Sequence, residues 1–160
     1  MKRAIYPGSF DPITKGHLDV LKTGAEIFDE VIIAVANNSS KNPLLTTEER
    51  VLLIKESIKD IKNAKVDTFD GLTIEYAKEK DAKVLLRGLR AVSDFEYEMQ
   101  LSQTNSALCP EIKTVFLITK PQYNFISSSA VKEIVLSNGD ISKFVPKPVC
   151  DYLKNKLKKD

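Results

Sequence analysis

A loop with the composition of a phosphate-binding site follows the first hydrophobic segment of the chain. It reads Tyr-Pro-Gly-Ser-Phe-Asp-Pro-Ile-Thr-Lys-Gly-His at positions 6–17. Gly16 would let a phosphate approach the backbone, and the helix expected to open there offers free N–H groups and a positive dipole end. Ser9 supplies a hydroxyl, and His17, the sole histidine, could donate to the same anion. The alternatives are a simple tight turn and a histidine without a catalytic role.

Three further segments carry groups suited to phosphate. The segment 86–90, Leu-Arg-Gly-Leu-Arg, follows the fourth expected strand, and arginine binds phosphate through two parallel donors. The segment 125–129, Phe-Ile-Ser-Ser-Ser, precedes an expected helix whose first N–H groups could bind the outer phosphates of a nucleotide. Lys41 follows the second expected strand. Surface arginines, ordinary serine caps and a solvated lysine are the alternatives.

The pattern of apolar residues predicts the strands and helices that would position these groups. Five short segments, rich in β-branched and aromatic residues, are typical of buried strands. They are 4–6, 31–35, 65–69, 84–86 and 114–118. Helical spacing is found at 17–28 and 48–61, and later helices are expected from the serines to Asn138-Gly139 and over 149–158.

Two helix starts match the S/T-x-x-E capping box. Thr46 pairs with Glu49, and Ser93 pairs with Glu96. Strands that alternate with such helices predict right-handed βαβ crossovers and therefore an α/β fold with a doubly wound parallel sheet, which is Rossmann-like. Ligands of such sheets bind at the carboxyl ends of the strands, near the switch point. The phosphate-binding candidates all follow strands, so we expect them to meet there.

Composition limits the class of protein. Of 160 residues, 42% are hydrophobic and 29% charged, which fits one domain over 1–160 whose core needs no metal or disulfide. Cys109 and Cys150 lie far apart without metal-ligand spacing and are expected to be ordinary cytosolic thiols. The net charge of +2 does not favour nucleic acid, and no stretch has the length of a signal or a membrane span. We expect a cytoplasmic protein that binds neither nucleic acid nor membrane.

Thr14-x-Gly16-His17 has the form of the (H/T)-x-G-H signature of nucleotidyltransferases. From end to end, the chain resembles bacterial phosphopantetheine adenylyltransferases. The resemblance rests on segments 6–17 and 125–129 and on Arg-Gly-Leu-Arg-Ala-Val-Ser-Asp-Phe-Glu-Tyr-Glu-Met-Gln at 87–100, which separates this family from other nucleotidyltransferases. It implies a homohexamer that transfers AMP from ATP to 4′-phosphopantetheine, giving dephospho-coenzyme A and pyrophosphate.

The resemblance also implies roles for individual residues. Those implied to bind the acceptor are Ser9, Lys41, Thr73 and Arg87, with Lys41 and Arg87 on its phosphate and Thr73 on the pantetheine arm. Those implied to line the ATP site are Ser9, Phe10, His17, Gly88, Leu89, Arg90, Glu98, Tyr123, Asn124, Phe125, Ile126, Ser127, Ser128 and Ser129. His17, Lys41 and Arg90 are the expected catalytic residues.

The expected reaction needs no general base, because a phosphate monoester with a second pKa near 6 is already an anion at pH 7. The protein has to hold two polyanions in line and stabilise the charge on the α-phosphate. Mg²⁺ is expected on the ATP phosphates. No carboxylate cluster suggests a metal site, and Asp11, the nearest candidate, could equally cap a turn. The alternatives are a related transferase with another phosphorylated acceptor, such as nicotinate mononucleotide or glycerol phosphate, and a non-catalytic ATP-binding module.

Overall fold

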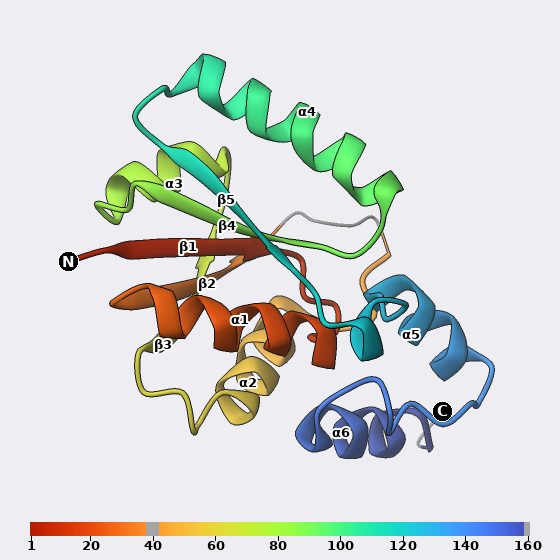
Figure 1. The fold of residues 1–160 in the computed structure, drawn as a ribbon. Coiled ribbons are helices and arrows are strands. Elements are labelled where there is room, and N and C mark those ends of the chain that lie inside the picture. The colour runs from red at the N-terminus through yellow and green to blue at the C-terminus, as the bar shows by residue number, and fades with distance from the viewer. Residues whose placement is uncertain (38–41, 159–160) are drawn as a thin grey trace.

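The computed structural model describes residues 1–37 and 42–158, so Lys41 lies outside the described residues. Five parallel strands form one sheet in the order β3-β2-β1-β4-β5 (Figure 1). The strands are β1 (Arg3–Gly8), β2 (Glu30–Ala36), β3 (Ala64–Phe69), β4 (Val84–Leu89) and β5 (Lys113–Ile118). The strand order reverses between β1 and β4, which makes the sheet doubly wound, as the sequence predicts.

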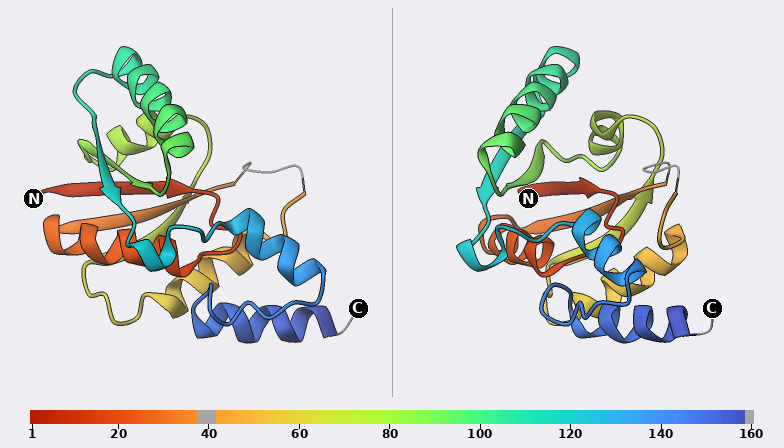
Figure 2. Two further views of the ribbon diagram at one scale, coloured as in Figure 1. Left: turned by 45° about the vertical axis from the view of Figure 1, so that its right-hand side comes forward. Right: turned by 90° about the vertical axis from the view of Figure 1, so that its right-hand side faces the viewer.

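Helices cover both faces of the sheet (Figure 1). They are α1 (Lys15–Ile27), α2 (Thr47–Ser57), α3 (Thr73–Glu79), α4 (Val92–Leu108), α5 (Ser128–Leu136) and α6 (Lys147–Lys158), with a 3₁₀ turn at Pro121–Tyr123. Alternate residues of β1 enter two cores, because successive side chains of a strand point to opposite faces. Ala4 and Tyr6 pack beneath α1, α2, α5 and α6, whereas Ile5 packs towards α3. Figure 2 shows α4 projecting beyond the sheet.

Several predicted boundaries need correction. The strand β4 continues to Leu89, so Arg87 lies within the strand instead of after it. The helix α4 begins at Val92 after the extended residue Ala91, which places Ser93 inside the helix and makes its predicted capping box wrong. The short helix α3 was not expected, because its seven residues are too few to show a clear period. The other predicted capping box is confirmed, since the Thr46 side chain accepts from the Glu49 N–H.

The ends of α5 and α6 also differ from expectation. Asn138, with φ of 59°, takes the left-handed conformation predicted for Gly139, which asparagine tolerates better than most residues. Gly139 is required for another reason, because a Cβ there would lie 2.4 Å from Cγ2 of Ile134. The helix α6 begins at Lys147, ahead of Pro148. A proline fits this first turn because the N–H groups there have no helical partner.

Two glycines bring α1 close to β4. A Cβ on Gly24 would lie 2.5 Å from Cδ2 of Leu86, and a Cβ on Gly88 would lie 2.8 Å from Cγ2 of Val20. Gly88, which is expected in the ATP site, thus also makes room for Val20 through its missing side chain. The two glycines thus set the distance between α1 and β4, and both of these elements carry predicted site residues.

Gly88→Ala is therefore expected to lower the free energy of unfolding by about 1–3 kcal/mol, the usual cost of overpacking. Urea denaturation followed by circular dichroism measures this loss. Adding Val20→Ala should recover part of it, because the smaller side chain makes room for the new Cβ. An unchanged denaturation midpoint for Gly88→Ala would show that α1 and β4 are not this close.

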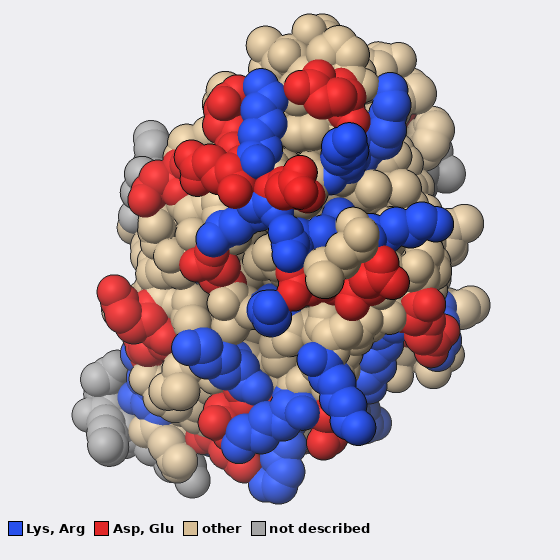
Figure 3. Space-filling view, turned by 90° about the vertical axis from the view of Figure 1, so that its left-hand side faces the viewer, with Lys and Arg blue, Asp and Glu red and all other residues tan. Residues whose placement is uncertain are grey.

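Charged side chains of both signs are interspersed on the face where the amino ends of the strands lie (Figure 3). Glu30, at the start of β2, is paired there with Arg3 at 2.5 Å and with Lys65 at 2.6 Å. Within the part of the chain that the structure describes, no helix combines the length and the apolar character needed to span a bilayer.

Candidate active site

A cavity of about 280 Å³ opens at the carboxyl ends of β1 and β4, at the switch point of the sheet. Most of its lining comes from the three segments that the sequence singled out. Predicted site residues in the lining are His17, Arg87, Gly88, Arg90, Glu98, Ile126, Ser127 and Ser128. Tyr6, Thr14, Gly16, Val20, Asp94, Tyr97 and Thr119 complete it. The first strand, the fourth strand and the start of α5 thus meet at one place, as expected.

His17 is held by a reciprocal cap at the start of α1. The Thr14 N–H donates to Nδ1 of His17 at 3.0 Å, and the His17 N–H donates to Oγ1 of Thr14 at 3.3 Å. Because Nδ1 accepts a hydrogen bond from a backbone N–H, it carries no proton itself, and the proton of the neutral ring is on Nε2. The ring also packs edge-on against Phe10, with centroids 4.9 Å apart. The fold therefore fixes both the tautomer and the orientation of the ring.

Burial lowers the pKa of His17 to about 4, and the positive charges of Arg90 and Arg87 act in the same direction. The ring is therefore neutral at physiological pH and donates through Nε2–H without carrying a charge. A donor of this kind can strengthen its bond to a phosphate oxygen as negative charge develops there.

The lowered pKa predicts a pH dependence of stability. The unfolded chain binds a proton at His17 near pH 6.5, whereas the folded chain binds it only near pH 4. The stabilising contribution is therefore complete above pH 6.5 and is lost as the pH falls from 6.5 towards 4. Melting temperatures measured across this range should fall less for His17→Gln than for the wild type. Parallel curves for the two proteins would contradict the assignment.

Arg87 and Glu98 form a bidentate ion pair between two cavities. Nε and Nη2 of Arg87 donate to the Glu98 carboxylate at 2.8 and 2.6 Å, and Nη1 donates to the Pro7 carbonyl at 3.1 Å. A second cavity of about 170 Å³ lies beyond this pair and is lined by Thr73 and, from α4, by Leu101, Ser102 and Asn105. The pair belongs to the lining of both cavities, of which the first is also lined by His17 and the second by Thr73.

Arg90 links the fourth strand to the segment before α5. Its Nε donates to Asp94 at 2.9 Å, and its Nη1 donates to the Ile126 carbonyl at 2.9 Å. Ser127 caps α5 by accepting from the Ala130 N–H, and the Ser128 hydroxyl donates to the Pro12 carbonyl at 2.8 Å. Capping at Ser127 is thus confirmed.

The remaining predicted ATP-site residues do not line the main cavity. Asn124, Phe125 and Ser129 are exposed at the surface, while Tyr123, Ser9 and Leu89 are half-buried. Phe10 is buried with its ring packed in the core and has a φ of 49°. Phe10 does not line the main cavity.

Sequence reasoning missed Tyr97 and Asp94 of α4, both of which line the main cavity. Helical spacing could have found them, since Asp94 and Glu98 are four residues apart and share a face. Asp11, considered as a metal ligand, accepts instead from the N–H groups of Leu44 and Leu45. Among residues 1–37 and 42–158, no group of three or more His, Cys, Asp or Glu side chains could hold a metal ion.

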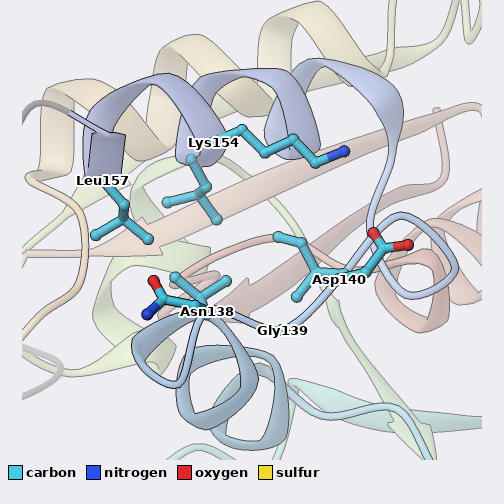
Figure 4. A pocket seen from close by; sticks show the side chains of 8 residues that line it. Asn138, Gly139, Asp140, Lys154 and Leu157 are labelled. Carbon is cyan, nitrogen blue, oxygen red and sulfur yellow. The ribbon is translucent and has the colours of Figure 1, made fainter.

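A larger cavity, of about 540 Å³, lies between α5 and α6, apart from the predicted site residues (Figure 4). Val135, Ile141, Leu153 and Leu157 supply apolar lining, and Asp140 and Lys154 supply charged groups. No predicted site residue that the structure describes contributes to its lining.

A parallel α/β sheet with a neutral histidine at the first helix and two arginines at the switch point is the arrangement of a nucleotidyltransferase. In agreement, the model of the cytidylyltransferase-like family matches residues 5–134. The chain is 54% identical to a phosphopantetheine adenylyltransferase of Alkaliphilus metalliredigens over 98% of its own length and 99% of the relative's. It is 56% identical to one of Lachnoclostridium phytofermentans, over 98% and 96%. The chain therefore belongs to the phosphopantetheine adenylyltransferase family.

Proposed function

We propose that the protein transfers the adenylyl group of ATP to 4′-phosphopantetheine and releases dephospho-coenzyme A and pyrophosphate. The observation that supports this most directly is the pair of cavities that meet at Arg87. One cavity contains His17 and Arg90 and suits a nucleotide, while the other contains Thr73 and suits an uncharged arm. An acceptor phosphate at Arg87 would lie between them.

The chemistry is then mainly positioning and charge stabilisation. The acceptor phosphate attacks the α-phosphorus of ATP in line, a P–O bond forms, and the bond to the pyrophosphate group breaks. The attacking group is already an anion, so no side chain has to remove a proton. His17 donates through Nε2–H to an α-phosphate oxygen, and Arg90 neutralises charge beside it. Lys41, which lies outside the described residues, would hold the acceptor phosphate together with Arg87.

Magnesium enters this scheme as part of the substrate, bound to the phosphates of ATP. The two carboxylates that line the main cavity, Asp94 and Glu98, are paired with Arg90 and Arg87. Neither is therefore offered as a magnesium ligand. The metal would neutralise charge on the leaving pyrophosphate, while Arg87 and Arg90 act on the acceptor and the α-phosphate.

We further propose that the protein is a homohexamer in the cytoplasm. The helix α4 exposes Phe95, Met99 and Leu108, and Ile118 at the end of the edge strand β5 is 83% exposed. Exposed apolar side chains of this size are typical of an interface. Cys109 and Cys150 are free thiols, which suits a reducing compartment. Sedimentation velocity tests the hexamer, and Leu108→Glu should shift the distribution towards smaller species.

The decisive experiment is incubation with Mg-ATP and 4′-phosphopantetheine, followed by assay for dephospho-coenzyme A and pyrophosphate. Nicotinate mononucleotide and glycerol phosphate, offered as acceptors in parallel, test the related transferase activities. If ATP binds but none of the acceptors gives pyrophosphate, the protein is a binding module, and the proposed activity is wrong.

A further inference from the structure

The hydroxyl of Tyr6 is a buried donor that the fold leaves without a partner. Tyr6 lies in β1, and only 5% of the residue is exposed. Within the described part of the chain, its hydroxyl makes no hydrogen bond. By contrast, the hydroxyls of Tyr76 and Tyr152 donate to the carboxylates of Asp67 and Glu49. Buried polar groups without a partner are rare and cost free energy, so the one on Tyr6 needs an explanation.

The Tyr6 hydroxyl opens into the main cavity. Among residues 1–37 and 42–158, no fully enclosed side-chain nitrogen or oxygen lacks a hydrogen-bond partner, so this hydroxyl must reach open space. Tyr6 lines the main cavity together with His17 and Arg87. It does not line the second cavity, which contains Thr73. The hydroxyl therefore lies on the side of the site that suits a nucleotide.

The ring of Tyr6 is held beside the ring of His17. It packs edge-on against Phe10, with centroids 5.3 Å apart, and its centroid lies 6.4 Å from that of His17. Its backbone is in register with Ile33 of the neighbouring strand β2, which fixes the start of the side chain. Tyrosine has only two side-chain torsions, so holding its hydroxyl in place costs little conformational entropy. Tyr6 and His17 therefore present two donors to one cavity from adjacent rings.

The Tyr6 hydroxyl acts as a donor and not as a base. Burial raises its pKa above the ordinary value for tyrosine, and the positive charge of Arg87 opposes this rise without cancelling it. The hydroxyl therefore stays protonated at physiological pH. Arg87 and Arg90 line the same cavity and favour an anionic ligand there. A phosphate oxygen is a strong acceptor for a hydroxyl, because such a bond is charge-assisted.

We propose that Tyr6 is a further catalytic residue, whose hydroxyl donates a hydrogen bond to an oxygen of the ATP α-phosphate beside the bond from His17. This inference rests on the proposed function, in which His17 donates to that phosphate. The hydroxyl gains its partner only when the nucleotide is bound. Like the Nε2–H of His17, it is a neutral donor already in place before charge develops on the α-phosphate, so its bond should strengthen in the transition state.

The first test compares Tyr6→Phe with Tyr76→Phe. Each substitution removes only a hydroxyl, and Tyr76 is the matched control because it is also 5% exposed but donates to Asp67 at 2.8 Å. Tyr6→Phe should lower kcat/KM for ATP about 10- to 100-fold, the usual effect of losing a hydrogen bond to a charged group. Its melting temperature without ligand should be unchanged or higher, because no bond within the protein is lost. Tyr76→Phe should show the reverse, with a lower melting temperature and an unchanged kcat/KM.

Either of two results would overturn the proposal. An unchanged kcat/KM for Tyr6→Phe would show that the hydroxyl is only hydrated in the cavity. A melting temperature lowered as much as in Tyr76→Phe would show that the hydroxyl supports the fold.

Calorimetry with AMP and with inorganic pyrophosphate identifies the phosphate that the hydroxyl contacts. Tyr6→Phe should raise the Kd for AMP at least about threefold and leave the Kd for pyrophosphate unchanged, because only AMP carries the α-phosphate. A loss confined to pyrophosphate would place the hydroxyl on the outer phosphates and contradict the assignment. These titrations do not depend on turnover. If the wild type forms no dephospho-coenzyme A, the proposed function fails, and the AMP titration still decides the role of Tyr6.

Discussion

His17→Ala is expected to lower kcat about 10²- to 10³-fold while leaving the Kd for ATP nearly unchanged. The Nε2–H of the neutral ring is aimed by the cap at Thr14, and the α-phosphate gains most of its charge only in the transition state. A donor that acts there contributes to turnover rather than to ground-state binding. Stopped-flow or steady-state kinetics give kcat, and calorimetry gives the Kd for ATP.

His17→Gln is the matched control, since its amide can place an N–H donor near the position of Nε2. It should recover part of the lost kcat, whereas an effect that came only from lost packing against Phe10 would not be recovered by an amide. If ATP affinity collapses while kcat holds, His17 binds the ground state and the assignment is wrong.

Arg87→Lys is expected to lower kcat/KM for phosphopantetheine about 10- to 100-fold and to affect the Kd for ATP much less. The charge is kept, but the planar fork that pairs with Glu98 and faces both cavities is lost. Charge-assisted bonds are worth about 1.5–3 kcal/mol each, and about 1.4 kcal/mol corresponds to a factor of ten. Steady-state kinetics with each substrate varied in turn measure the effect.

Pantetheine, which lacks the phosphate, is the control ligand for this prediction. Its binding should change much less than that of phosphopantetheine in Arg87→Lys, because pantetheine lacks the group that the guanidinium would hold. Glu98→Gln should reproduce part of the loss for phosphopantetheine, since the carboxylate holds the guanidinium in place. If the wild type adenylylates pantetheine as well as phosphopantetheine, the phosphate is not the nucleophile, and the role of Arg87 is wrong.

The local pattern of residue types was sufficient to predict many of the strands and helices of this protein. The five strands are recognisable because buried parallel strands read as short β-branched runs, and the start of α2 is recognisable because its cap is made by residues close in sequence. The meeting of three segments at one edge also follows from the sequence, since parallel strands place their carboxyl ends together. The glycine, serine, histidine and arginine residues within those segments then indicated a site that binds phosphate groups.

What the sequence could not provide depends on distances between residues far apart in the chain. Gly88 was expected only as a residue of the ATP site, and the packing of α1 shows that its missing side chain also makes room for Val20. Ser93 matched a cap pattern, but the backbone becomes helical at Val92. Asp11 resembled a turn cap or a metal ligand, and its partners are amides 33 and 34 residues away.

The sequence by itself determined the class of fold, the edge of the sheet where the candidate site lies and the family, because these depend on local periodicity and on side-chain types. The tertiary structure decided which nitrogen of His17 carries the proton and which carboxylate orients Arg87. The reason is physical: hydrogen-bond partners, burial and shifted pKa values are properties of the space around a residue. Long-range folding creates that space, and sequence neighbours do not specify it.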